Sequence, residues 1–256
     1  RTQEKHATRF RSIQTSLLFV IVPAVIISMA VLSLMGYLSS KAIIQTSAGT
    51  EMSQCLSVAM GSIEMSLSNN RMVAETMARG VEAVQRQAVK GDQTASDWDA
   101  AAYQEILTSF VGSNPETFGG GIWFEPYQYR PEQRYFSPYC MRQNGAVTYV
   151  DNYSLGEGVY YTDQDWYTNA ANTTQKSVWS APYYDEFAQI SMVTSSAPIY
   201  DETGRFLGVA TADIDLTQMQ QMVLSLDVVA NGRAFLIDDT GVYIADEDSE
   251  KLLSAN

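Results

Sequence analysis

Aromatic residues and carboxylates alternate through residues 160–215, where the sequence concentrates side chains that can bind a charged small molecule. The segment reads YYTDQDWYTNA, then KSVWSAPYYDE, and ends in APIYDETGRFLGVATADIDL. A buried ammonium group needs carboxylate partners and aromatic faces to replace its water shell. We predict such a pocket here, with Asp185 and Asp213 as the carboxylates and Trp166, Tyr167 and Tyr183 as walls.

Positive charge is scarce in the same segment. Lys176 and Arg205 are its only basic residues, and Arg205 follows a glycine, so we expect it in solvent at a hairpin tip. Residues 150–256 hold 17 acidic and 4 basic residues, whereas residues 1–149 hold 12 of each. This distribution argues against nucleic acid as a partner, because binding phosphates requires a basic surface. It suits a cationic ligand, although acidity also serves solubility.

The N-terminal region has the composition of a membrane anchor. Residues 1–12 carry four bases and one acid, and no charged residue occurs between Arg11 and Lys41. The apolar stretch at residues 17–38 would be about 33 Å long as a helix, enough to cross a membrane. A signal peptide would have a shorter apolar core and a small-residue cleavage site. The basic flank places residues 1–16 in the cytoplasm and the rest of the chain outside the cell membrane.

The remaining patterns predict an α+β fold. Residues 39–90 lack proline and have helical spacing, which predicts a long stalk helix. A loop at residues 91–97 and a second helix precede short β-rich runs separated by turns, and together these form a predicted sensing module at residues 91–216. Residues 217–230 predict a connecting helix, and residues 231–256 the start of a second module, so we expect a fragment of a longer protein. Cys55 and Cys140 are expected to be free thiols rather than a bridge.

Four local signatures occur in the order found in one family. They are DWYTNA at residues 165–170, WSAPYYDE at residues 179–186, PIYDETGRFLGVATADIDL, and GRAFLIDDTGVYIAD. With the predicted span and long helix, they make residues 17–256 resemble a double Cache (dCache) sensor domain of bacterial chemoreceptors, histidine kinases and diguanylate cyclases. The resemblance implies two PAS-like antiparallel-sheet modules, with the membrane-distal one binding small molecules. It also implies a homodimer and a cytoplasmic output domain, which this chain lacks. We favour a chemoreceptor, with a histidine kinase or diguanylate cyclase sensor as the alternative.

A subset of that family binds amino acids through a recognisable pattern. Its arginine, two positions before a Trp-Tyr pair, holds the ligand carboxylate, but here that position is Gln164. The elements that would hold the ligand amine are present, which favours an amine without a carboxylate over an α-amino acid. The resemblance and the residue chemistry together give the predicted ligand-binding residues: Tyr160 (or Tyr161 in its place), Gln164, Asp165, Trp166, Tyr167, Tyr183, Asp185 and Asp213.

Other interpretations remain open. Trp166 and Tyr167 could be core residues, and Asp163 with Asp165 could contribute to a Ca²⁺ site. No catalytic residue, metal or cofactor is predicted, because the sequence has no G-x-S-x-G or P-loop motif and its single histidine, His6, lies on the predicted cytoplasmic side. A glycosidase using Asp185 and Asp213 would need a long open cleft, and a structural ectodomain would have no pocket. A closed aromatic pocket would favour a sensor.

Overall fold

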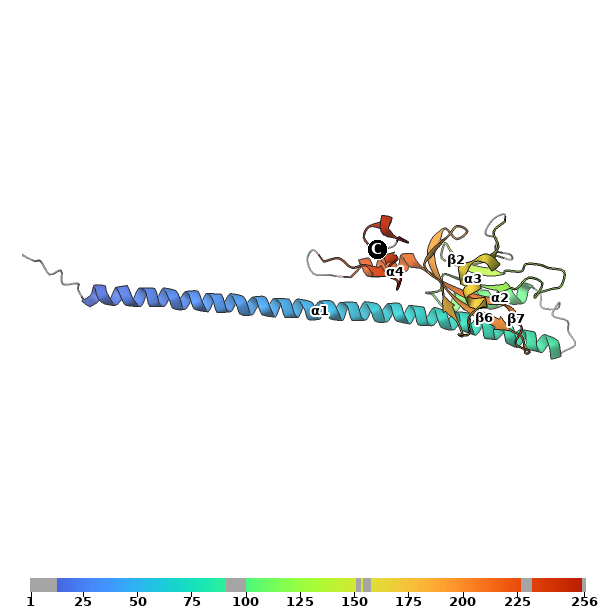
Figure 1. The fold of residues 1–256 in the computed structure, drawn as a ribbon, viewed down its shortest axis with the longest axis horizontal. Coiled ribbons are helices and arrows are strands. Elements are labelled where there is room, and N and C mark those ends of the chain that lie inside the picture. Colours follow the sequence, from blue (N-terminus) through green and yellow to red (C-terminus); the bar gives the residue numbers. More distant parts are fainter. Residues whose placement is uncertain (1–12, 91–99, 151–152, 154–157, 227–231, 255–256) are drawn as a thin grey trace, which may run out of the picture. The chain divides into compact units, whose positions relative to one another are not determined.

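The computed structural model describes residues 13–90, 100–150, 153, 158–226 and 232–254, in two compact units, residues 1–54 and 55–256 (Figure 1). The basic residues 1–12, the expected loop at 91–97 and residues 227–230 of the expected connecting helix lie outside the described residues.

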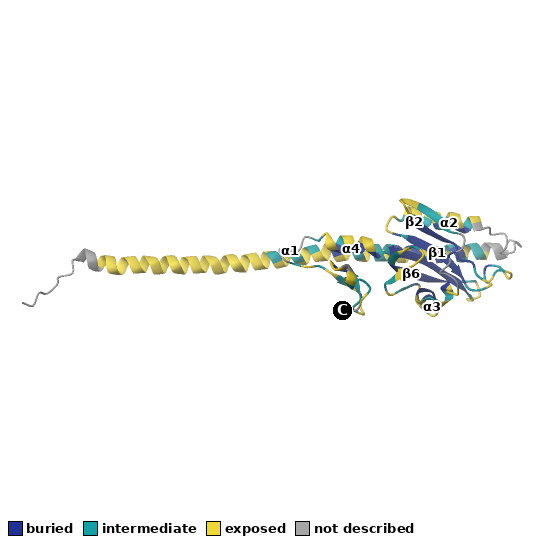
Figure 2. Ribbon diagram, turned by 90° about the horizontal axis from the view of Figure 1, so that it is seen from above, coloured by how far each residue is buried: buried dark blue, intermediate teal, exposed yellow. Residues whose placement is uncertain are grey.

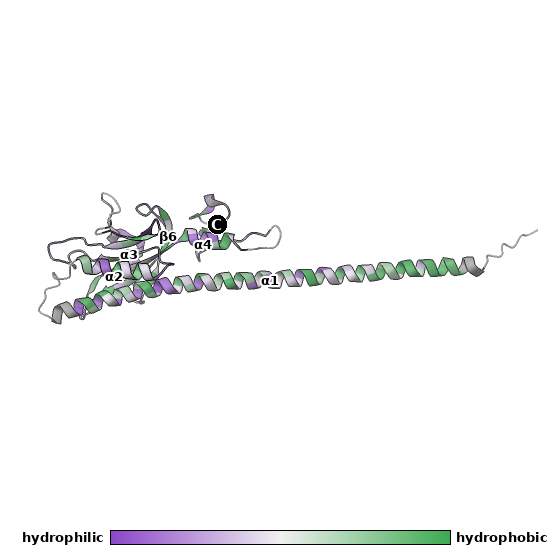
Figure 3. Ribbon diagram, turned by 180° about the vertical axis from the view of Figure 1, so that it is seen from behind, coloured by the Kyte–Doolittle hydropathy of each residue, from purple (hydrophilic) through white to green (hydrophobic). Residues whose placement is uncertain are grey.

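Helix α1 (Ile13–Lys90) is a single 78-residue helix that contains both the expected span and the expected stalk. Pro23 is the only proline within it, and it lies ten residues after the helix start, where its missing N–H removes one i→i−4 hydrogen bond. The apolar side chains between Leu17 and Leu38 are exposed, and this part of α1 is long and apolar enough to cross a membrane. Figure 3 shows the hydrophobic character of this region.

The second unit is built on an antiparallel sheet of seven strands. Their order is β3-β2-β1-β7-β6-β4, and β5 also pairs with β6. The strands are β1 (Gly119–Phe124), β2 (Tyr139–Gln143), β3 (Ala146–Val150), β4 (Val178–Trp179), β5 (Tyr183–Asp185), β6 (Ile190–Tyr200) and β7 (Phe206–Asp215). Together with the helices, this sheet confirms the predicted α+β class.

The two faces of the sheet differ in composition. Because side chains alternate along a strand, Ile122 and Phe124 of β1 pack with α2 (Ala100–Ser113) and the C-terminal part of α1, whereas Trp123 packs with α3 (Asp165–Ala171). Both faces are therefore covered, and Figure 2 shows the sheet as the most deeply buried part of the second unit. The face toward α1 and α2 is largely aliphatic. The face toward α3 is rich in aromatic side chains.

Three tight turns connect consecutive strands. Asn144 and Gly145 both have positive φ, 52° and 80°, as a two-residue turn between β2 and β3 requires. Between β6 and β7, the Asp201 carboxylate accepts hydrogen bonds from the backbone N–H groups of Thr203 and Arg205, at 2.8 and 3.0 Å. Asp238 repeats this turn between β8 (Leu236–Ile237) and β9 (Tyr243–Ala245), so the two Asp-x-Thr-Gly sequences fold alike.

Short helices complete the unit. The 3-10 helix η2 (Tyr161–Asp163) precedes α3, and η3 (Ser249–Lys251) follows β9. Helix α4 (Leu216–Leu224) begins after Asp215, whose carboxylate caps it by accepting from Thr217 N at 2.8 Å. Asp215 is therefore committed to a helix cap. Cys55 and Cys140 are free thiols.

Candidate ligand-binding site

A small cavity lies on the aromatic face of the sheet. Its volume is about 10 Å³, which is room for roughly one water molecule, so its own side chains nearly fill the site in this structure. Five aromatic rings, two carboxylates and two threonines dominate its lining. The lining residues are Trp123, Tyr139, Tyr153, Trp166, Tyr183, Asp185, Met192, Thr194, Thr211 and Asp213.

Asp213 is placed by the register of two central strands. It lies directly opposite Thr194 in the β6–β7 pair, and its side chain is 3% exposed. Thr194 Oγ1 donates to Asp213 Oδ1 at 2.8 Å, and Tyr139 Oη donates to Asp213 Oδ2 at 2.7 Å. When Asp213 is ionised, the Thr194 proton is used on it, so Tyr183 Oη is then the donor in its 2.9 Å contact with Thr194. Hydroxyl donors therefore satisfy this carboxylate without a cation.

Asp185 is the second carboxylate of the cavity. It comes from the last position of β5 and is buried. Its Oδ1 accepts from Tyr153 Oη at 2.5 Å and from the Ala188 backbone N–H at 2.7 Å. The Tyr153 ring packs edge-on against Trp123, with 5.2 Å between centroids. The hydrogen bond to Asp185 thus anchors one wall of the cavity.

Glycines in β1 make room for the aromatic walls. A Cβ added to Gly119 would lie 2.1 Å from Tyr139 Oη, and one added to Gly121 would lie 2.8 Å from the Trp123 ring. The absence of a side chain at Gly119 allows Tyr139 to reach Asp213 across the strand, and its absence at Gly121 leaves room for the Trp123 ring. Trp123 is held in turn by a 2.8 Å hydrogen bond from its Nε1 to Thr211 Oγ1.

The electrostatics of the cavity favour a cation. Burial raises the pKa of Asp213 to about 7, and the hydrogen bonds from Tyr139 and Thr194 oppose that rise only in part. The pKa of Tyr139 is raised well above its usual value, first by burial and then by the negative charge of Asp213. No Lys, Arg or His is found among the described residues that line the cavity. A bound ammonium would supply the positive charge that Asp213 lacks.

The structure brings four of the eight predicted ligand-binding residues together, namely Trp166, Tyr183, Asp185 and Asp213. Gln164 and Asp165 line a neighbouring cleft of about 340 Å³, which shares Trp166 and Tyr183 with the cavity.

The other two predicted residues lie elsewhere. Tyr160 is 41% exposed and stacks on Tyr135, with 5.1 Å between ring centroids. Tyr167 is buried, and its hydroxyl donates to Glu125 at 2.7 Å. Neither side chain lines the cavity.

Sequence reasoning missed six of the ten lining residues, namely Trp123, Tyr139, Tyr153, Met192, Thr194 and Thr211. Tyr139 and Trp123 lie before the segment on which the prediction was centred, and only sheet pairing brings them to it. Alternation supplied a usable signal, because Thr211 and Asp213 share one face of β7. In β1, Gly119 and Gly121 lie two residues apart on one face, and glycines at such positions indicate that another side chain packs closely over the strand.

The alternative interpretations can be compared with this geometry. Trp166 and Tyr167 do belong to a buried aromatic cluster, and Trp166 also lines the cavity. Among the described residues, no group of three or more His, Cys, Asp or Glu is placed to hold a metal ion. Asp163 and Asp165 therefore belong to no such group. Asp185 and Asp213 lie in a very small aromatic cavity rather than the long open cleft that a glycosidase would need.

The family model and the curated relatives that this chain matches are all described as methyl-accepting chemotaxis proteins or their sensor domains. Residues 103–221 match the family model described as "methyl-accepting chemotaxis protein-like, first PDC sensor domain". Over 84 residues, the chain is 38% identical to the methyl-accepting chemotaxis protein McpC of Bacillus subtilis, covering 33% of this chain and 13% of McpC. The chain spans between 13% and 31% of the length of the curated chemotaxis proteins that it matches.

Solved sensor domains share the fold. An extracellular domain described as that of a histidine kinase, mmHK1S-Z3, superposes with a TM-score of 0.61 at 22% identity, covering 75% of this chain and 68% of that one. The ligand-binding domain of the Campylobacter jejuni chemoreceptor Tlp3, in complex with L-valine, gives a TM-score of 0.55 at 18% identity, covering 79% and 73%. At these identities the likeness shows the fold alone.

Proposed function

We propose that residues 103–221, which match the methyl-accepting chemotaxis protein-like PDC sensor model and share the Cache-type fold, form a sensor domain that binds a small organic cation bearing an ammonium group. The observation that carries the proposal is the buried Asp213, which has hydroxyl partners and aromatic walls but no cation beside it among the residues that the structure describes. A ligand ammonium would be held by charge-assisted hydrogen bonds and by the faces of Trp123 and Trp166.

The same cavity is poorly suited to a carboxylate. Removing a carboxylate from water is costly unless a cation or several N–H donors receive it. Gln164 lines the neighbouring cleft and carries no charge. We therefore propose an amine in preference to an α-amino acid, and binding without catalysis.

Ligand binding would be transmitted to α1 through a short hydrogen-bonded connection. The backbone oxygen of Asp213 accepts from Phe118 N at 2.8 Å. The preceding residue, Thr117, donates from Oγ1 to Asn70 Oδ1 at 2.8 Å, and Asn70 belongs to α1 and is fully buried. A ligand that shifts β7 would act on α1 through these contacts. This requires that the domain has two arrangements of β7 and α1 and that the ligand binds one of them more tightly than the other.

The larger setting follows from the apolar part of α1. We propose that residues 17–38 span the cell membrane, with residues 1–16 in the cytoplasm and the sensor domain outside. The full protein would be a homodimeric chemoreceptor whose cytoplasmic output domain lies beyond this chain. Residues 231–256 would begin its second, membrane-proximal module, after a connecting helix at residues 217–230.

A thermal-shift screen of the full chain in detergent tests the proposal. The panel pairs each amine with the amino acid that bears the same side chain, and adds organic acids and purines. A ligand at about 100 times its Kd adds about 2.7 kcal/mol of stability, which is a measurable shift. We expect shifts with amines, lost in Asp213→Asn and kept in Asp239→Asn, an exposed aspartate outside the cavity. Shifts with amino acids alone would contradict the proposal.

A further inference from the structure

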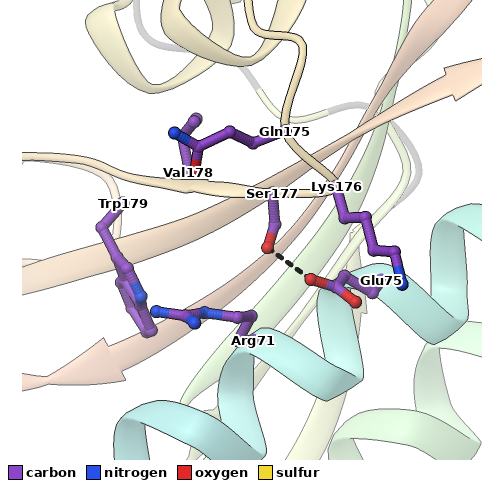
Figure 4. Close-up of a pocket in the computed structure, with 7 residues that line it drawn as sticks. All are labelled: Arg71, Glu75, Gln175, Lys176, Ser177, Val178 and Trp179. Carbon is purple, nitrogen blue, oxygen red and sulfur yellow. Dashed lines mark hydrogen bonds between the residues drawn. The ribbon is translucent and has the colours of Figure 1, made fainter.

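A second, larger cleft lies between α1 and the segment that leads into β4 (Figure 4). Its volume is about 470 Å³, in the range of small-molecule sites. Its lining is polar and charged, unlike that of the aromatic cavity. The lining residues are Arg71, Glu75, Gln175, Lys176, Ser177, Val178 and Trp179.

Two cations of this cleft have no ion-pair partner among the described residues. Within 4.0 Å, no carboxylate pairs with Arg71 or Lys176 in the part of the chain that the structure describes. The carboxylate of the cleft, Glu75, is instead bound by Ser177, whose Oγ donates to Glu75 Oε1 at 2.6 Å (Figure 4). Lys176 is also one of only four basic residues in the strongly acidic stretch 150–256. The cleft thus holds a local positive excess in an acidic protein.

We propose that this cleft binds a small organic dicarboxylate. The guanidinium of Arg71 can hold one carboxylate through two parallel hydrogen bonds, and Lys176 can bind the second as a point charge. Trp179 adds a flat apolar wall with an indole N–H donor. The Asp213 cavity cannot take this ligand because its lining is acidic, so the two sites would accept ligands of opposite charge.

The position of the cleft gives such a ligand access to the signalling helix. The dicarboxylate would bridge Arg71 of α1 and Lys176, which lies just before β4, and β4 pairs with β6. Just after β4, Ser180 N donates to Thr194 O at 2.9 Å, and Thr194 N donates to Ser180 Oγ at 3.0 Å. Thr194 is the residue whose hydroxyl binds Asp213. The cleft and the cavity therefore share one strand segment.

Isothermal titration of the full chain in detergent with succinate tests the site at low ionic strength. We expect saturable binding that weakens about tenfold in Arg71→Gln and in Lys176→Gln, since each removes a charged partner of one carboxylate. Arg86→Gln is the matched control, because Arg86 is an exposed cation of the same helix outside the cleft, and it should leave the succinate Kd unchanged. Added salt should weaken binding, because both cations are exposed.

Several results would overturn this site. They are no saturation up to about 10 mM succinate, equal affinity for inorganic phosphate, or a succinate Kd unaffected by both cleft variants. Asp213→Asn separates the two proposals: it should leave only weak amine binding and leave succinate binding intact. Loss of succinate binding in that variant, with both cleft variants unaffected, would place the anion elsewhere.

Discussion

Amine affinity should fall steeply when the pH is lowered through the pKa of Asp213. This carboxyl is buried, which raises its pKa to about 7 in the ligand-free protein. An ammonium requires the ionised form, whereas the amine itself, with a pKa near 10, stays protonated throughout. The ionised fraction of Asp213 is about 0.75 at about pH 7.5 and about 0.03 at about pH 5.5. Because the apparent Kd equals the intrinsic Kd divided by this fraction, it should rise about 25-fold between the two.

Isothermal titration in buffers of different ionisation enthalpy would measure both the Kd and the proton exchange. At about pH 6, most Asp213 carboxyls are protonated before binding and ionised after it, so nearly one proton should be released for each amine bound. In Asp213→Asn, the remaining weak affinity should be independent of pH over this range. An amine Kd that is the same at both pH values in the wild type, with no proton release, would refute the assignment of Asp213 as the ammonium partner.

Three further outcomes follow from the same geometry. Since the folded-state pKa of Asp213 is raised above its ordinary 3.8, the ligand-free protein should lose stability as the pH rises from about 4 to about 7, by up to about 4 kcal/mol, and thermal melts of Asp213→Asn should lack that loss. Gly119→Ala should destabilise the domain by about 1–3 kcal/mol and abolish amine binding by displacing Tyr139, whereas Gly112→Ala, where nothing lies within 4 Å, should do neither in denaturant melts and titrations. Gln164→Arg should bring the Kd of an amino acid closer to that of the matching amine, because the added guanidinium can hold the ligand carboxylate. An unchanged ratio of the two Kd values would exclude residue 164 as a determinant of ligand preference.

The fold was predictable from the sequence where local chemistry decides it. The Asn144-Gly145 turn has the side chains that positive φ requires, and the absence of proline after Pro23 permits the continuous α1. The residues that line the candidate cavity were predictable only where they belong to one contiguous segment, as Trp166 and Asp213 do.

What escaped prediction depends on pairing between distant strands. Tyr139 reaches Asp213 because β2 and β7 flank β1, and no local pattern specifies that order. Tyr160 fails to line the cavity for a similar reason, since its ring stacks on Tyr135, a residue outside the segment under consideration. The cleft lined by Arg71 and Lys176 is likewise formed between α1 and residues about a hundred positions later in the chain.

A crystal structure of the chain with a stabilising amine would test the central claim most directly. The account predicts the ligand nitrogen within about 3 Å of a carboxylate oxygen of Asp185 or Asp213, with Trp123 and Trp166 moved apart to admit it. A ligand bound elsewhere, with the cavity still closed and Asp213 still bonded only to Tyr139 and Thr194, would contradict it.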